Sequence, residues 1–239
     1  MTNNIRQAHI PSPSRDVVIA IDGPAASGKS TVAKALAKKL GFRYMDTGAM
    51  YRALTFLAIR KGLNLEDEDA LEESLKDSKI SLEESPGGGI RVLADGMDVT
   101  QDIRLPEITD KVFYIARSQR MRTLMRKAQR EFASKGPTIA EGRDMASVVF
   151  PQSKIKFYLD ADERERARRR SKELKEKGIG ESFQKVLSDI RERDKKDFDR
   201  SVAPLKKTPD AIYVDTTHMK IEEVVSALIE KVNEKLKGI

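Results

Sequence analysis

The amino-acid sequence contains no cysteine and no tryptophan, and only two of its 239 residues are histidine. Without cysteine the chain can form no disulfide, no thiolate zinc or iron–sulfur site and no cysteine nucleophile. Two histidines argue against a histidine-based metal cluster. Aromatic residues make up only 5% of the chain, which leaves few platforms for base stacking and argues against binding of single-stranded nucleic acid.

Long apolar runs are also missing from the sequence. No segment reaches the length that crosses a membrane, and the stretch MTNNIRQAHIPSPSR lacks the apolar core of a signal peptide. We therefore expect a cytoplasmic protein without membrane association. Residues 1–16 are polar and contain proline and serine, which predicts a flexible tail.

Hydrophobic residues make up 39% and charged residues 35% of the chain, and the formal net charge is +7. That apolar content suffices for a folded core, so wholesale disorder is excluded. The length suits one domain with insertions or two small domains. The positive charge indicates either nucleic-acid binding or a site for small phosphorylated ligands.

Five apolar segments alternate with segments of helical periodicity, which predicts an α/β fold. The first, VVIAID, is a continuous apolar run of the kind that is buried in parallel sheets. The expected strands are 17–22, 42–45, 138–140, 155–160 and 211–215. Together they predict a P-loop type of fold with a five-stranded parallel sheet and helices on both faces.

The middle of the chain interrupts this alternation. KISLEE (79–84) and IRVLAD (90–95) alternate apolar and polar residues around the turn cluster SPGGG. This pattern predicts a β-hairpin, followed by a third short strand near Val99. The predicted division of the chain is a P-loop core of 17–62 and 117–239 and an inserted subdomain of 63–116.

The residues after the first strand, GPAASGKS, match the phosphate-binding pattern G-x-x-x-x-G-K-[ST]. An apolar strand precedes them and an amphipathic helix follows, and in that context the backbone N–H groups cradle phosphates. Lys29 then supplies a positive charge near the β- and γ-phosphates, and Ser30 can bind Mg²⁺. The predicted ATP-binding residues are Gly23, Pro24, Ala25, Ala26, Ser27, Gly28, Lys29, Ser30 and Thr31.

This motif does not name a reaction, because GTPases, motor ATPases and kinases share it. The N-K-x-D sequence by which GTPases recognise guanine is absent, and no apolar strand ends in Asp-Glu as motor ATPases require. These absences favour a kinase.

Two segments at the ends of predicted strands carry side chains suited to a phosphorylated ligand, and ligands bind at that edge of an open α/β sheet. In DTGAMYR, Thr47 is either a helix N-cap or a ligand contact. In EGRD, Arg143 can clamp a phosphate with its planar fork. Asp144 can hold Mg²⁺ or accept a hydrogen bond from an exocyclic amine. The alternative for this pair is an ordinary surface salt bridge.

A predicted helix around 182–200 carries an inward stripe that changes from apolar to charged. The stripe consists of Phe183, Val186, Leu187 and Ile190 and, by further steps of three and four, Arg193, Asp197 and Arg200. Charged groups on an inward stripe need paired partners or a ligand. The alternative is a surface salt bridge at a fraying helix end.

Arginines crowd the helix that follows strand 155–160, and Gly178 and Gly180 come after it. Such a charge run is either a solvated face or a lid, about 163–181, whose glycine hinges bring arginines over a transferring phosphoryl group. A nucleic-acid-binding module would have to use the same arginines, and nothing else in the sequence strongly favours one.

In order and spacing, these segments resemble the bacterial cytidylate kinases over about residues 17–238. The resemblance rests on IDGPAASGKST, MDTGAMYRAL, the hairpin-containing insert, AEGRDMASVVFP, LDADERERARRR and RERDKKDFDRSVAPL. It implies transfer of the γ-phosphoryl group of ATP to CMP or dCMP with Mg²⁺. It also implies a nucleoside monophosphate kinase core with a mobile lid, in which the insert is an enlarged monophosphate-binding subdomain.

The resemblance also implies a set of residues for the acceptor. This CMP-binding set is Thr47, Tyr51, Arg52, Arg122, Gly142, Arg143, Asp144, Arg193, Asp197 and Arg200. Within it, Arg122 and Asp144 would recognise the cytosine, and Thr47 would lie near the pyrimidine ring.

Further roles follow from the same resemblance. Arg52 and Arg143 would grip the acceptor phosphate with help from Arg200, and Arg193 and Asp197 would hold the sugar hydroxyls. Arg166 and Arg170 would be lid arginines that close on ATP. The predicted catalytic residues are Lys29, Arg143, Arg166 and Arg170, and the predicted Mg²⁺ ligand is Ser30.

Two positions depart from the family pattern. Phe113 follows Val112 where the family often has serine, which puts one polar contact to the base in question. Met145-Ala146-Ser147 follow the GRD motif where Gly-Thr is more usual, and the hydroxyl is kept. Two alternatives stay open: a P-loop kinase for UMP or a non-nucleotide acceptor, and an ATP-switched or nucleic-acid-binding module. We expect small nucleotides as partners, no stable nucleic-acid partner and a monomer.

Overall fold

The computed structural model describes residues 17–85 and 89–237. The predicted tail, 1–16, and three residues of the SPGGG turn lie outside the described residues. Within the described ranges, no helix combines the length and the apolar character that a membrane span requires.

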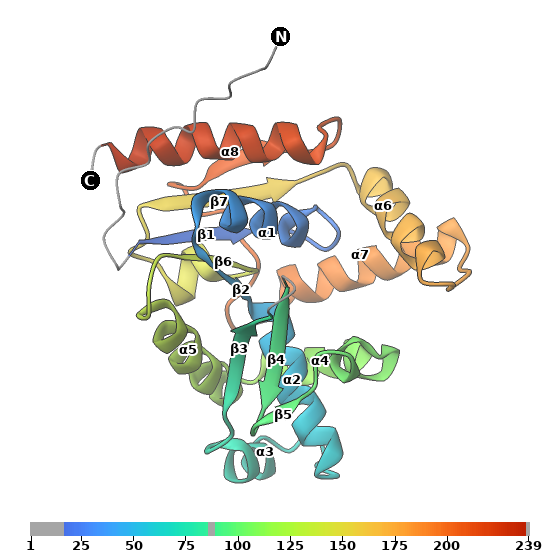
Figure 1. Cartoon of the computed structure of the whole chain (residues 1–239). Coiled ribbons are helices and arrows are strands. Elements are labelled where there is room, and N and C mark those ends of the chain that lie inside the picture. The colour runs from blue at the N-terminus through green and yellow to red at the C-terminus, as the bar shows by residue number, and fades with distance from the viewer. Residues whose placement is uncertain (1–16, 86–88, 238–239) are drawn as a thin grey trace.

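A five-stranded parallel sheet forms the centre of the protein, and it confirms the prediction from the apolar runs (Figure 1). Its strands lie in the order β2 (Arg43–Asp46), β6 (Thr138–Gly142), β1 (Val18–Asp22), β7 (Ile155–Asp160) and β8 (Ile212–Asp215). β1 is apolar because it lies in the middle of the sheet with both faces covered. The loop that follows β1 therefore emerges at the centre of the carboxyl edge, flanked by the loops after β6 and β7.

Helices cover both faces of this sheet (Figure 1). On one face lie α1 (Lys29–Leu40) and α8 (Ile221–Leu236), which share an apolar cluster with Phe157 of β7. On the other face lie α2 (Thr47–Arg60) and α5 (Gln119–Ala133), in a second cluster. The alternating side chains of the strands feed these two clusters in turn.

The segment between α2 and α5 forms a second, antiparallel sheet and two helices. α3 (Glu68–Leu75) precedes β3 (Ile80–Glu84), β4 (Ile90–Ala94) and β5 (Met97–Asp98), and α4 (Pro106–Arg117) follows them. The hairpin and the third strand are confirmed, whereas neither helix is among the elements that the sequence predicts. β3 and β4 pack against α2, and one apolar cluster runs from the central sheet through α2 to these strands.

α6 (Glu163–Glu176) and α7 (Phe183–Asp199) form a helical hairpin beside the carboxyl edge of the central sheet (Figure 1). Between the two helices lies a separate small cluster: Ala167, Leu174, Val186, Leu187 and Ile190. Ala26 of the phosphate loop packs against this cluster. The apolar part of the predicted stripe on α7 is therefore buried, and it seats the hairpin on the loop after β1.

Candidate active site

The phosphate loop has the backbone that its glycines predict. Gly23 has a φ of 150°, and a Cβ there would lie 1.9 Å from the carbonyl oxygen of Leu159, so only glycine fits. The Lys29 ammonium is buried and donates to the Pro24 carbonyl at 2.6 Å and to Ser27 Oγ at 3.3 Å. Burial, followed by the charge of Arg143, lowers the pKa of Lys29 to about 7. Ser30 is exposed at the start of α1.

Two charged residues of the helical hairpin hold the loop from outside. Asp194 accepts a hydrogen bond from the backbone N–H of Ala25 at 3.0 Å, and Arg166 Nη1 donates to the carbonyl of the same residue at 3.0 Å. Arg166 and Asp194 are buried and form an ion pair, and Arg166 Nε also donates to the Ala161 carbonyl. Arg166, expected as a lid arginine, is thus bound to protein groups in this structure.

Asp194 is a residue that the sequence reasoning missed. The predicted charged stripe ran from Ile190 to Arg193 and Asp197, but the buried carboxylate is Asp194, four residues after Ile190. Arg193 is exposed. The sequence could have indicated this residue, because Asp194 lies four positions after Ile190 and therefore on the same helix face.

Asp22 was missed as well. It ends β1, is almost fully buried, and accepts hydrogen bonds from the backbone N–H groups of Met145 at 2.9 Å and Ala146 at 2.8 Å. Burial, opposed by these two bonds, raises the pKa of Asp22 to about 7. Met145 begins the short π-helix Met145–Val149, which directly follows Arg143 and Asp144. The strand that leads into the phosphate loop therefore also holds the acceptor-side loop.

The predicted cytosine-recognising residues come together. Arg122 of α5 and Asp144 are both buried and form a close ion pair. Arg122 Nη1 also donates to the Ala116 carbonyl at 2.9 Å, and its guanidinium lies 5.5 Å from the ring centre of Tyr51. Arg200 approaches Asp144 at 3.9 Å. An acceptor-only carboxylate and a donor-only guanidinium are thereby fixed side by side.

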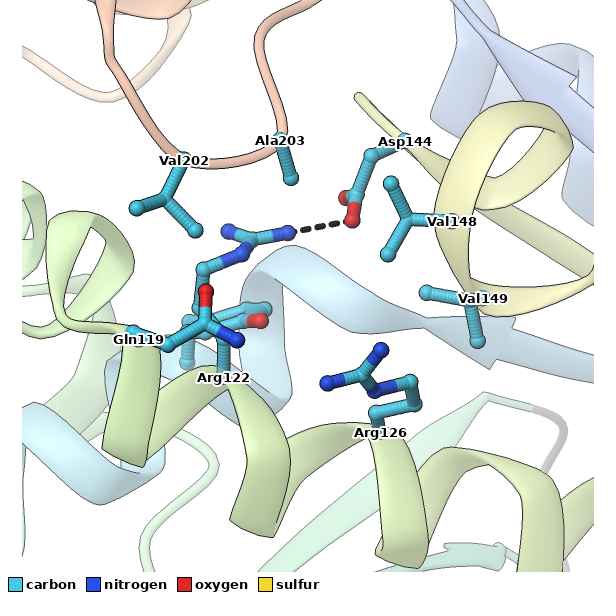
Figure 2. Close-up of a pocket in the computed structure, with 9 residues that line it drawn as sticks. Gln119, Arg122, Arg126, Asp144, Val148, Val149, Val202 and Ala203 are labelled. Carbon is cyan, nitrogen blue, oxygen red and sulfur yellow. Dashed lines mark hydrogen bonds and ion pairs between the residues drawn. The ribbon is translucent and has the colours of Figure 1, made fainter.

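Beside this pair lies a cavity of about 100 Å³ (Figure 2). Its lining consists of Tyr51, Gln119, Arg122, Arg126, Asp144, Val148, Val149, Val202 and Ala203. Figure 2 shows valine side chains on two sides and the polar groups of α5 below. Gln119 and Arg126 are not among the predicted site residues.

The predicted phosphate- and sugar-binding residues also converge. Arg143 Nε donates to Asp197 at 2.6 Å. Although burial opposes it, Arg143 holds the pKa of Asp197 below its usual value. Although Arg193 is exposed, crowding by the surrounding protein and then the charge of Arg143 act to lower its pKa, and the charge of Arg52 adds to the effect. Guanidinium groups from three elements therefore share one region at the carboxyl edge of the sheet.

Thr47 is not a helix N-cap, so that interpretation was wrong. Asp46 caps α2 instead, because its side chain accepts from the Ala49 N–H at 2.8 Å. Thr47 Oγ1 is buried and donates to the Glu141 carbonyl at 2.6 Å. A Cβ at Gly142 would lie 2.7 Å from this hydroxyl, so Gly142 allows the close contact.

The Glu141 carboxylate lies within hydrogen-bonding reach of Ser30. Glu141 and Asp46 are register partners at the ends of β6 and β2. Glu141 is buried and accepts from the Tyr44 hydroxyl at 2.5 Å. Burial raises the pKa of Glu141, while Lys29 and Ser30 act to lower it. Hard oxygen ligands of this kind suit Mg²⁺.

Three further arginines of α6 are bound to neighbouring protein groups. Arg170 Nη1 contacts Glu173 at 2.8 Å, and Arg169 Nη1 donates to Thr216 Oγ1 at 3.1 Å. Arg168 pairs with Glu165. The helix face is therefore a set of internal ion pairs and hydrogen bonds, which weakens the interpretation of this charge run as a free nucleic-acid-binding strip.

Comparison with known proteins agrees with the sequence motifs. A family model described as cytidylate kinase matches residues 19–234. A cytidylate kinase of Bacillus licheniformis is 44% identical over 221 residues, which cover 92% of this chain and 98% of that protein. A cytidylate kinase of Carboxydothermus hydrogenoformans is 45% identical over 218 residues, which cover 91% of this chain and 97% of that protein. With a phosphate loop, a buried Arg–Asp pair and relatives matched over nearly their whole length, the chain belongs to the cytidylate kinase family.

Proposed function

We propose that the protein transfers the γ-phosphoryl group of ATP directly to CMP or dCMP, giving ADP and CDP or dCDP. The observation that carries this proposal is the buried Arg122–Asp144 pair, which lies beside a cavity at the same sheet edge as the phosphate loop. Cytosine offers an amino donor beside a ring-nitrogen acceptor, and the pair offers an acceptor beside donors. The proposed nucleotide sites thus face one another across the carboxyl edge.

In this proposal the phosphate loop and Lys29 hold the ATP phosphates. Arg143 and Arg52 would bind the acceptor phosphate, and Arg193 and Asp197 the sugar hydroxyls. Transfer between phosphates needs alignment and charge neutralisation more than a general base. The converging guanidinium groups supply that charge, and ion pairs with Asp197 orient Arg143 and Arg200.

Mg²⁺ fits the oxygen donors beside the phosphate loop. Ser30 would hold it, with Glu141 and Asp46 as the nearby carboxylates. When bound, the ion neutralises charge on the phosphates of ATP. Because the Arg122 ion pair occupies Asp144, we favour base recognition over metal binding for that carboxylate.

We propose that 63–116 carries the acceptor-binding subdomain and that about 163–181 acts as the lid. A lid is needed because water in the site would hydrolyse ATP. Arg170 pairs with Glu173 on α6 in this structure, and closure of the lid would bring it toward the phosphates of ATP. Small nucleotides are the proposed partners, and a cytoplasmic location and a monomeric state stay predictions from the sequence.

The test is production of ADP from ATP in a coupled assay with a panel of acceptors. We expect turnover with CMP and dCMP, slower turnover with UMP and none with non-nucleotide alcohols. ADP release that ignores the acceptor, or that is fastest with a non-nucleotide, would contradict the proposal. Salt-dependent retention on nucleic acid without turnover would instead favour the binding-module alternative.

A further inference from the structure

Three arginines lie on one face of α5 at intervals of four residues: Arg122, Arg126 and Arg130. The outer two are engaged with the loop that follows β6. Arg122 pairs with Asp144, while Arg130 donates to the carbonyls of Val149 at 2.9 Å and Val148 at 3.3 Å. The middle arginine, Arg126, forms no ion pair with any of the described residues, and its one hydrogen bond is to Thr123 Oγ1 at 3.3 Å.

Arg126 lines the cavity beside the Arg122–Asp144 pair. Figure 2 shows its guanidinium just above α5, between Arg122 and Val149 in this view, with Asp144 above it. It is close enough to Tyr51 for its charge to act on the pKa of that phenol. A partly buried cation without a carboxylate partner among the described residues, placed at a cavity, can bind an acceptor group of a ligand.

The donors and acceptors of the cavity limit what Arg126 can bind. A guanidinium only donates hydrogen bonds, so it cannot meet the amino group at position 4 of cytosine. In the proposed complex, that amino group faces Asp144, and Arg122 donates to the acceptors at positions 3 and 2. The carbonyl oxygen at position 2 has a second lone pair, which is left for another donor.

We propose that Arg126 is a base-binding residue that donates to the carbonyl oxygen at position 2 of the pyrimidine acceptor. This inference rests on the proposed function and extends it. Cytosine and uracil share this oxygen, so Arg126 adds affinity for every pyrimidine nucleotide, and Asp144 alone discriminates between them. The two tasks of base recognition are thereby divided between neighbouring charged side chains.

The test compares Arg126→Met with Lys127→Met, which removes the same charge from the next, exposed position of the same helix. The affinity of each variant for CMP, UMP and the monophosphate of pyrimidin-2-one riboside, which keeps the position-2 oxygen and lacks the amino group, is measured by calorimetry. Loss of a charge-assisted hydrogen bond should weaken all three nucleotides by about tenfold or more in Arg126→Met. Lys127→Met should bind like the wild type.

Each outcome decides the inference. Equal binding by Arg126→Met and Lys127→Met, or a loss confined to UMP, would overturn it. Arg126→Lys keeps the charge and one donor, so partial recovery in a variant with an unchanged melting temperature supports it and separates binding from folding. Because binding is measured without turnover, failure of the wild type to phosphorylate CMP would overturn the proposed function separately.

Discussion

Replacing Asp22 with asparagine should weaken binding of the acceptor nucleotide while the chain still folds. The two Asp22 oxygens accept the N–H groups of Met145 and Ala146. Asparagine keeps one acceptor and turns an NH₂ group toward the other N–H. A buried donor left without a partner costs about 1–3 kcal/mol. If the loop that carries Arg143 and Asp144 shifts to avoid this cost, a 2 kcal/mol loss corresponds to a rise of about 30-fold in the KM for CMP.

The stability of the same variant should move in the opposite direction at high pH. The pKa of Asp22 is about 7 in the folded chain against 3.8 ordinarily, so the folded state holds this proton more tightly than the unfolded state. The contribution of Asp22 to the free energy of unfolding is therefore complete below pH 4, and it is lost as the pH rises to about 7. With 1.36 kcal/mol per pKa unit, ionised Asp22 costs the wild type roughly 4 kcal/mol at pH 8. Asparagine cannot ionise, so the variant does not lose this unfolding free energy as the pH rises.

Two measurements check this prediction for Asp22→Asn. Initial rates with CMP varied at saturating ATP, and with ATP varied at saturating CMP, should show a raised KM for CMP alone. Urea unfolding of wild type and variant from pH 4 to pH 8 should show that the variant loses less stability over this range. Asp110→Asn, at an exposed position of α4, is the control. Equal changes in both KM values, or parallel stability curves, would refute the reasoning.

Three further predictions concern residues of the site. Lys29→Ala should reduce turnover by several orders of magnitude and leave the melting temperature within a few degrees, since the ammonium neutralises phosphate charge; activity within about tenfold of wild type would contradict this. Asp194→Ala should lower the stability by about 3–5 kcal/mol, because it leaves Arg166 buried and unpaired, and urea unfolding would show no change if the pair is dispensable. We expect the wild type to prefer CMP over UMP in kcat/KM by at least about tenfold, and Asp144→Ala should shrink this preference. A variant that keeps the preference but needs far more Mg²⁺ would instead make Asp144 a metal ligand.

The parts of the fold that the sequence predicts are those with a local signature. Strand 17–22 is an apolar run that ends in Asp22, because both faces of β1 are covered. The phosphate loop is local too, since one short segment supplies all its N–H groups. α4 was missed although its sequence carries a helical pattern, in which Ile108, Val112, Ile115 and Ala116 recur at steps of three and four.

The missed site residues depend on partners far away in the sequence. Asp22 meets backbone groups that lie 123 residues and more along the chain, and nothing near it announces that contact. Asp194 meets Ala25, 169 residues away. A carboxylate whose partner is a backbone N–H of another element leaves no pairing pattern in the sequence, so only the tertiary structure reveals it. Arg126 was identified only from the cavity that it lines.

The small apolar cluster of the α6–α7 hairpin makes this hairpin a separate cooperative unit. It holds five buried side chains, whereas each face of the central sheet has a much larger cluster. Such a unit can open by local unfolding while the sheet stays intact. Opening would also break the contacts of Arg166 and Asp194 with Ala25, so the phosphate loop would lose its outer support. A ligand that needs the ordered loop therefore stabilises the closed hairpin by mass action, without touching most of it.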